Sequence, residues 1–188
     1  MKKISLGIII GNREFFPDHL VSEARNDIMN LFDKFNINPI ILSNEDTKLG
    51  GVETFKDAEK CANLFKSKND IIDGVIVILP NFGDEKGVAD ALRLSDLKLP
   101  VLVQAYPDDL DKLDPKNRRD AYCGKISVCN NLYQYGIKYT LTKKHTIHLK
   151  DQEFKNELMD FISVCRVVKG MKNVRIGAVG ARPTAFNT

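Results

Sequence analysis

The apolar segment at residues 71–79 constrains the fold of this chain more than any other stretch. It reads Ile-Ile-Asp-Gly-Val-Ile-Val-Ile-Leu and stops at Pro80. A nearly continuous run rich in β-branched residues is typical of a strand covered on both faces, as in a parallel sheet. Residues 4–10 and 100–105 have the same character, and residues 39–42 form a shorter run. The sequence therefore predicts four buried strands.

Segments with helical spacing of apolar residues alternate with these runs. Asp18 is predicted to be the N-cap of the first helix, and Thr54 with Asp57 three residues later resembles a capping box. Asp84 or Glu85 begins a third helix, and Gly170 is predicted to end the last one. We expect helices over residues 18–35, 54–65, 84–94, 123–135 and 151–169.

Strands that alternate with helices imply right-handed crossovers and helices on both faces of the sheet. We predict an α/β fold class, a three-layer Rossmann/flavodoxin-like parallel sheet with the order 2-1-3-4-5, and a fifth strand at residues 139–141. Residues 1–170 would form this domain. Residues 174–180 read as a further strand with nothing after it to cover it. We therefore expect residues 171–188 to start a second domain of a longer polypeptide.

Composition excludes several classes of protein. The chain has 188 residues, and its 28 basic and 25 acidic side chains leave a dispersed net charge of +3 that does not favour nucleic acid. Its four cysteines form no Cys-x-x-Cys pair, as in a reduced cytoplasmic protein. Neither a secretory signal nor an apolar run of about 18 residues is present, so no membrane partner is expected.

Polar and aromatic residues follow three of the predicted strands. The carboxyl ends of parallel strands share one edge, where open α/β sheets bind ligands. Amides, an arginine fork and aromatic faces suit the hydroxyl groups and the apolar side of a sugar. The plain alternative is that they are turn and capping residues on the surface. The predicted sugar contacts are Asn12, Arg13, Phe15, Asn81, Phe82, Gln104 and Tyr106.

Other chemistry is poorly represented. The chain lacks a Gly-x-Gly-x-x-Gly fingerprint and a Walker-type phosphate loop. His145 and His148 are interpreted as solvated polar residues, and no set of His, Asp and Glu has convincing metal-ligand spacing. Glu14, Asp84 and Glu85 could act as acid or base, but no pattern assigns them that role. We predict no catalytic residue and no metal ligand in this chain.

Three motifs resemble the N-terminal region of the L-fucose/L-arabinose isomerase family of sugar ketol-isomerases. They lie at residues 8–18, 80–85 and 175–186. The resemblance implies an enzyme that interconverts an aldose and a ketose through an enediol, with a divalent metal, typically manganese, in a cytoplasmic oligomer. It places the metal ligands in later domains. It also implies that this domain covers the active site of a neighbouring subunit, with Arg13 and Phe82 at the positions that touch the sugar.

Two functional hypotheses follow. In the first, the chain is the substrate-capping domain of a metal-dependent isomerase and is inactive alone; its partners are a small-molecule sugar, its own C-terminal domains and neighbouring subunits. Arg13 would bind hydroxyl groups, Asn81 and Gln104 would fix orientation, and Phe15, Phe82 or Tyr106 would stack. In the second, the chain is a stand-alone sugar-binding or regulatory α/β module.

Overall fold

A five-stranded sheet organises the chain, and all of its strand pairs are parallel. The computed structural model describes residues 3–172, 174–177 and 179–180. The strand order is β2-β1-β3-β4-β5, which confirms the predicted order and the α/β Rossmann-like class. The strands are β1 (Ser5–Ile10), β2 (Asn38–Ile40), β3 (Gly74–Leu79), β4 (Val101–Ala105) and β5 (Thr140–Leu141).

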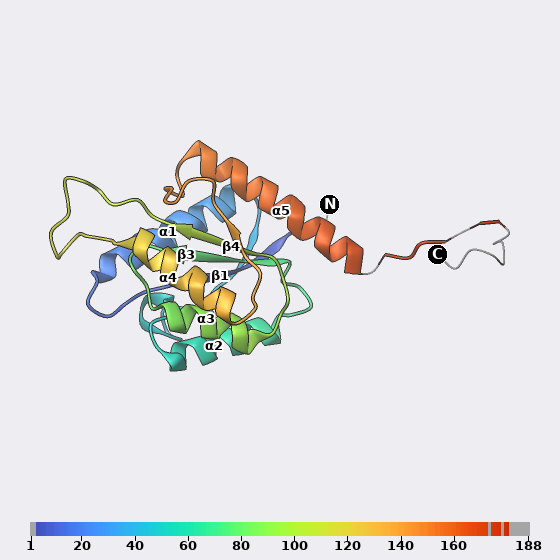
Figure 1. Cartoon of the computed structure of the whole chain (residues 1–188), viewed down its shortest axis with the longest axis horizontal. Helices are drawn as coiled ribbons and strands as arrows, with labels where there is room; N and C mark the ends of the chain where they lie inside the picture. The colour runs from blue at the N-terminus through green and yellow to red at the C-terminus, as the bar shows by residue number, and fades with distance from the viewer. Residues whose placement is uncertain (1–2, 173, 178, 181–188) are drawn as a thin grey trace.

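Helices cover both faces of this sheet (Figure 1). One face packs against α1 (Asp18–Lys34) and α5 (Gln152–Lys172). The other face packs against α2 (Phe55–Ser67), α3 (Glu85–Ser95) and α4 (Ala121–Gln134), while the short 3-10 turn η1 (Lys48–Gly50) precedes α2. Neighbouring strand residues point to opposite faces, so a strand buried on both sides must be apolar throughout. Accordingly, Ile8 belongs to the core under α1 and Ile9 to the core under α2.

The helix ends confirm some of the capping residues predicted from the sequence and contradict others. The capping box at Thr54 and Asp57 is confirmed, and Asp84 caps α3 by accepting a hydrogen bond from the Gly87 N–H. Asp18 is not an N-cap: it is the first residue of α1, and the preceding Pro17 makes no side-chain cap. Gly170 does not end the last helix either, because α5 continues to Lys172.

The predicted strand at residues 174–180 is wrong for the residues that the structure describes there. Residues 174–177 and 179–180 belong to no strand. Their apolar side chains have no covering layer: Ile176 is 89% exposed and Val179 is fully exposed. Residues 181–186 of the third motif lie outside the described residues. No described helix is long and apolar enough to span a bilayer.

Candidate functional site

The loops after β1 and β3 meet at the carboxyl edge of the sheet. Ile10 pairs with Ile78 in the register, so the two strands end level with one another. Beyond the strands, the N–H of Asp84 donates to the carbonyl of Asn12 at 2.8 Å. The two loops are therefore fixed to each other by main-chain contacts as well as by their side chains.

Arg13 and Phe82 are half-buried at this edge and lie in contact with each other. The Cζ atom of Arg13 lies 4.3 Å from the centroid of the Phe82 ring, and its Nε–H donates to the carbonyl of Gly83 at 3.0 Å. Its Nη2 pairs with Glu85, and the two side chains are 27% and 31% exposed. A partly exposed ion pair is worth only about 0–1 kcal/mol. A ligand hydroxyl can therefore compete with Glu85 for this guanidinium.

Asn12 and Asn81 lie beneath Arg13, in the interior. Their exposed fractions are 3% and 0%. Asn81 donates from Nδ2 to Oδ1 of Asn12 at 2.6 Å, and Asn12 donates from Nδ2 to Oε1 of Glu53 at 2.7 Å. Burial raises the pKa of Glu53. The structure therefore brings both predicted amides to the site, where they bind protein groups and support the loops from below.

The aromatic residues of the β1–α1 loop divide between the surface and the interior. Phe15 is 73% exposed, whereas Phe16 is only 4% exposed. The rings of Phe15 and Phe16 are 4.6 Å apart, and those of Phe16 and Phe82 are 6.5 Å apart and stacked. Phe16 therefore supports Phe82, while Phe15 is free to contact another molecule.

Gln104 and Tyr106 do not reach the surface in this conformation. Both are 0% exposed. The Nε2 of Gln104 donates to the carbonyl of Ile147 at 2.6 Å, and its Oε1 has no partner among the described residues. The Tyr106 hydroxyl donates to Asp27 at 3.2 Å, and burial raises its pKa, which keeps it protonated. Their assignment as sugar contacts stays a prediction that requires movement of the covering chain.

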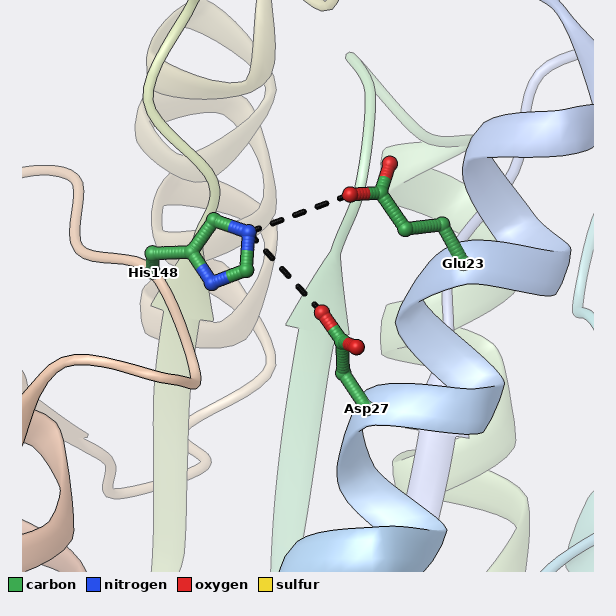
Figure 2. A group of neighbouring side chains, drawn as sticks. All are labelled: Glu23, Asp27 and His148. Atoms are coloured by element: carbon green, nitrogen blue, oxygen red, sulfur yellow. Dashed lines mark ion pairs between the residues drawn. The ribbon is translucent and has the colours of Figure 1, made fainter.

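Two carboxylates and a histidine meet behind Tyr106. Glu23 and Asp27 are one turn apart on α1, and the Nε2 of His148 lies 3.8 Å from an oxygen of each. Figure 2 shows both carboxylates directed at this ring nitrogen. The interpretation of His148 as solvated is wrong: it is half-buried, and its ring lies 4.8 Å from the Tyr106 ring. His145 is exposed, as predicted.

This Glu23–Asp27–His148 group is close enough to share a metal ion, but its chemistry does not fit one. The Nδ1 of His148 accepts a hydrogen bond from the Lys150 N–H at 3.1 Å. In the neutral ring the proton is therefore on Nε2, the nitrogen that faces the carboxylates, where a metal would need a lone pair. Arg119 and Lys150 also contact the two carboxylates, at 2.6 and 2.9 Å. The negative charge is already balanced.

The same cations explain the titration of Glu23. Burial by itself raises the pKa of this carboxyl group, but the hydrogen bond and charge of Arg119 outweigh it and hold the pKa below its usual value. Contact with Asp27 raises the pKa of Lys150. The group is best described as an ionic cluster that joins α1 to the segments before α4 and α5.

Glu53 and Asp27 contact predicted site residues but were not predicted from the sequence. For Asp27 no local signal exists, because it lies among the polar positions of α1 and its partner Tyr106 is 79 residues away. For Glu53 a signal was available. The predicted order places β2 beside β1, so the loop after β2 must also reach the edge near Asn12; a bridge between Gly11 and Val52 makes this contact.

A cavity lies at the opposite edge of the sheet. It has a volume of about 620 Å³ and is lined by residues at the amino ends of β3 and β4, including Val75 and Val101, and by the turn after α4 at Gly136. It contains none of the predicted sugar contacts. The geometry of the carboxyl edge, rather than the size of a cavity, therefore identifies the candidate site.

Comparison with known proteins identifies a family for this domain. No curated protein matches the chain. A model of the fucose/sulfoquinovose isomerase N-terminal domain matches residues 7–172, a range that begins within β1 and ends with α5 and so includes the complete carboxyl edge. The match spans most of the sequence, and the chain therefore belongs to the family of fucose/sulfoquinovose isomerase N-terminal domains.

Proposed function

We propose that this domain supplies sugar contacts to the active site of a metal-dependent aldose–ketose isomerase, and that it does not catalyse the reaction alone. The observation that carries the proposal is the guanidinium of Arg13, held against the Phe82 ring at the carboxyl edge. The family match supports the class of enzyme.

The chemistry of this pair suits a sugar. Arg13 uses Nε for Gly83 and Nη2 for Glu85, which leaves Nη1 with no partner among the described residues. An arginine fork donates hydrogen bonds that match hydroxyl oxygens, and an aromatic face packs against the C–H side of a sugar ring. Arg13, which covers one face of Phe82, therefore offers the donor, and the exposed ring of Phe15 in the same loop offers a free aromatic face.

Exposed apolar side chains near this edge favour a protein neighbour. Phe15 is 73% exposed, Leu110 82% and Leu113 56%. The last two belong to the long β4–α4 loop, which projects from the body of the domain (Figure 1). Contiguous apolar surface is typical of interfaces with another chain, whereas single exposed apolar side chains are also common on monomers. We propose that a neighbouring subunit of the isomerase covers them and holds the reacting part of the sugar.

The metal is proposed to bind to another part of the enzyme. Glu23, Asp27 and His148 are the one described group of suitable spacing, and their tautomer and cation partners do not fit an ion. We also propose that proton transfer belongs to other parts of the enzyme. The role of this domain would be to bind and orient the sugar.

Hydrogen exchange with L-fucose tests the sugar contact. We expect the sugar to slow amide exchange at residues 12–16 and 81–85 of the complete isomerase. Residues 96–100, which line the cavity at the opposite edge, should exchange at an unchanged rate. Unchanged exchange in both loops at a saturating sugar concentration would contradict the proposal.

Mixed oligomers test whether Arg13 contacts the sugar bound by its own subunit or by a neighbouring subunit. Subunits with Arg13→Met would be combined with subunits that have lost their metal ligands. If Arg13 serves a neighbour, each mixed pair contains one intact site, and activity at low L-fucose concentration should exceed the sum of the two parents. Activity equal to that sum would show that Arg13 serves its own subunit or none.

A further inference from the structure

Hydrogen bonds on either side of the Gly83 backbone link Arg13 to Glu53. The Arg13 Nε–H donates to the carbonyl of Gly83 at 3.0 Å, and the Gly83 N–H donates to Oδ1 of Asn81 at 2.9 Å. Asn81 donates to Asn12 at 2.6 Å, and Asn12 donates to Glu53 at 2.7 Å. The series crosses three loops and ends on the segment before α2.

All the bonds in this series run in the same direction. The Gly83 N–H can only donate, so Oδ1 of Asn81 must face it and Nδ2 must face Asn12. The same reasoning turns Nδ2 of Asn12 toward Glu53, whose carboxylate only accepts. The three bonds from the Gly83 N–H through the two side-chain amides to Glu53 are aligned head to tail, and such bonds strengthen one another in a low-dielectric interior. The Gly83 N–H therefore sets the orientation of the Asn81 amide, and Asn81 and Glu53 together set that of Asn12, whose Nδ2 needs an acceptor at position 53.

Glu53 is itself held in place. Its N–H donates to Oδ2 of Asp57 at 3.2 Å, the carboxylate that also completes the capping box of α2. Gly83, at the other end, has φ +71°, a conformation that side-chain-bearing residues adopt at a cost. The buried amides of Asn12 and Asn81 thus connect two fixed points. A change at Glu53 would reach Arg13 through them.

We propose that Glu53 is a positioning residue: through Asn12, Asn81 and Gly83 it fixes the guanidinium of Arg13 in its sugar-binding position. The role at the sugar rests on the proposed function of Arg13, whereas the effect on the Arg13 side chain does not. Glu53 is partly exposed but is not required to touch the sugar.

Substitutions at Glu53 distinguish a positioning role from a general contribution of this residue to the stability of the fold. Glu53→Met keeps the length of the side chain and removes the acceptor, so Asn12 loses its partner. Glu53→Gln still presents an oxygen and should rescue the series. Glu59→Met is the matched control, because Glu59 is an exposed carboxylate on the adjoining helix.

The first measurement is NMR of the 188-residue chain. The Nε–H of Arg13 gives its own signal, and its exchange with water reports the bond to Gly83. We expect this exchange to be about 5-fold faster in Glu53→Met and to change less than about 2-fold in Glu53→Gln and Glu59→Met. An unchanged rate in a folded Glu53→Met chain would overturn the inference.

The second measurement is a double-mutant cycle in the complete isomerase, with L-fucose and Mn²⁺. Glu53→Met should raise the apparent KM about 3- to 10-fold with kcat nearly unchanged, and should have little further effect in an Arg13→Met background. Equal effects in both backgrounds, or a loss of kcat and stability without a rise in KM, would refute the positioning role. If Arg13→Met itself left KM unchanged, the proposed sugar contact of Arg13 would be wrong. The NMR measurement would still test whether Glu53 holds the Arg13 side chain in place.

Discussion

The guanidinium of Arg119 is hydrogen-bonded to the carboxylate of Glu23, with 2.6 Å between Nη2 and Oε2. Its Nη1 donates to the carbonyl of Pro80 at 3.0 Å, and its Cζ lies 4.9 Å from the centroid of the Tyr106 ring. The side chain is 11% exposed. Arg119 therefore joins α1 to the ends of β3 and β4 directly behind the candidate site.

Replacement of this arginine should destabilise the domain. Arg119→Met leaves Glu23 and the Pro80 carbonyl without a donor, and we expect it to lower the free energy of unfolding by about 2 kcal/mol. Arg118→Met is the control: Arg118 is 48% exposed and pairs with Asp120, so its loss should change stability by less than about 0.5 kcal/mol. Urea denaturation of both variants measures the difference. Equal effects would show that Arg119 is only a surface ion-pair partner.

The contact of α4 with the Phe82 loop depends on a glycine. A Cβ atom on Gly124 would lie 1.7 Å from the carbonyl oxygen of Phe82, a main-chain atom that cannot move aside alone. Gly124→Ala should therefore destabilise the chain by about 3 kcal/mol or more. Gly170→Ala, with nothing within 4 Å of its Cβ, should stabilise α5 by about 0.5 kcal/mol. Thermal unfolding that ranked the two variants alike would contradict this packing.

Lys125 is a buried cation with two oxygen partners. Its Nζ donates to Oγ1 of Thr142 at 2.7 Å and to the carbonyl of His145 at 2.9 Å, and the residue is 4% exposed. Burial lowers the pKa of Lys125 from 10.5 to about 8. Between these two values the unfolded chain binds a proton that the folded chain does not. The contribution of Lys125 to stability should therefore rise with pH across this window.

A comparison with Lys125→Met tests whether the stability contribution of Lys125 rises with pH. Below the folded pKa, the lysine is charged in both states and the full cost of its burial is present. As pH rises from about 7.5 to about 10, the wild type should gain on the order of 1 kcal/mol of stability relative to the variant. Urea denaturation at both pH values measures this change. A difference that is independent of pH would mean that the buried amine keeps its ordinary pKa.

The sheet could be predicted because its strands carry their own signal. A strand such as β3, buried on both faces, must be apolar throughout, and this pattern requires no knowledge of its neighbours. The ends of helices were less certain. Thr54 and Asp57 satisfy each other within four residues and were recognised, whereas Gly170 gives no local sign that α5 continues past it. The apolar residues near Val174 resembled a strand, but no described strand pairs with them.

The candidate site was partly predictable for a topological reason. Once the strand order is known, Arg13 and Phe82 must lie on one edge, and they are in contact there. The positions of Tyr106 and Asp27 depend on how α1 lies over the sheet. The two residues are 79 positions apart in the sequence, so no short-range pattern can predict the contact between their side chains. Burial of Gln104 has the same origin, because the segment at Ile147 that covers it comes from far along the chain.

The ionic cluster also makes a prediction about metal. Because Arg119 and Lys150 already neutralise Glu23 and Asp27, Mn²⁺ at about millimolar concentration should raise the melting temperature of the 188-residue chain by less than about 1 °C, and EDTA should not lower it. Glu23→Gln is the control for any small effect. A rise of several degrees that Glu23→Gln abolishes would show that the cluster rearranges to bind metal.

Contact between Arg13 and the sugar is the proposed role of this domain. Its most direct test is the apparent KM for L-fucose of an Arg13→Met isomerase, measured with Mn²⁺. Arg166→Met is the control, because Arg166 is exposed at the opposite edge, near Ile4. Arg13→Lys keeps the charge but not the fork and should fall between wild type and Arg13→Met.

Arg13→Met should raise KM about 10-fold, with kcat within about 2-fold of wild type, because the contact stabilises bound sugar and transition state alike. Bound Mn²⁺ per subunit should be unchanged. A KM equal to that of Arg166→Met, in a folded enzyme with its metal, would show that Arg13 does not bind the sugar and would remove the carboxyl edge from the sugar site.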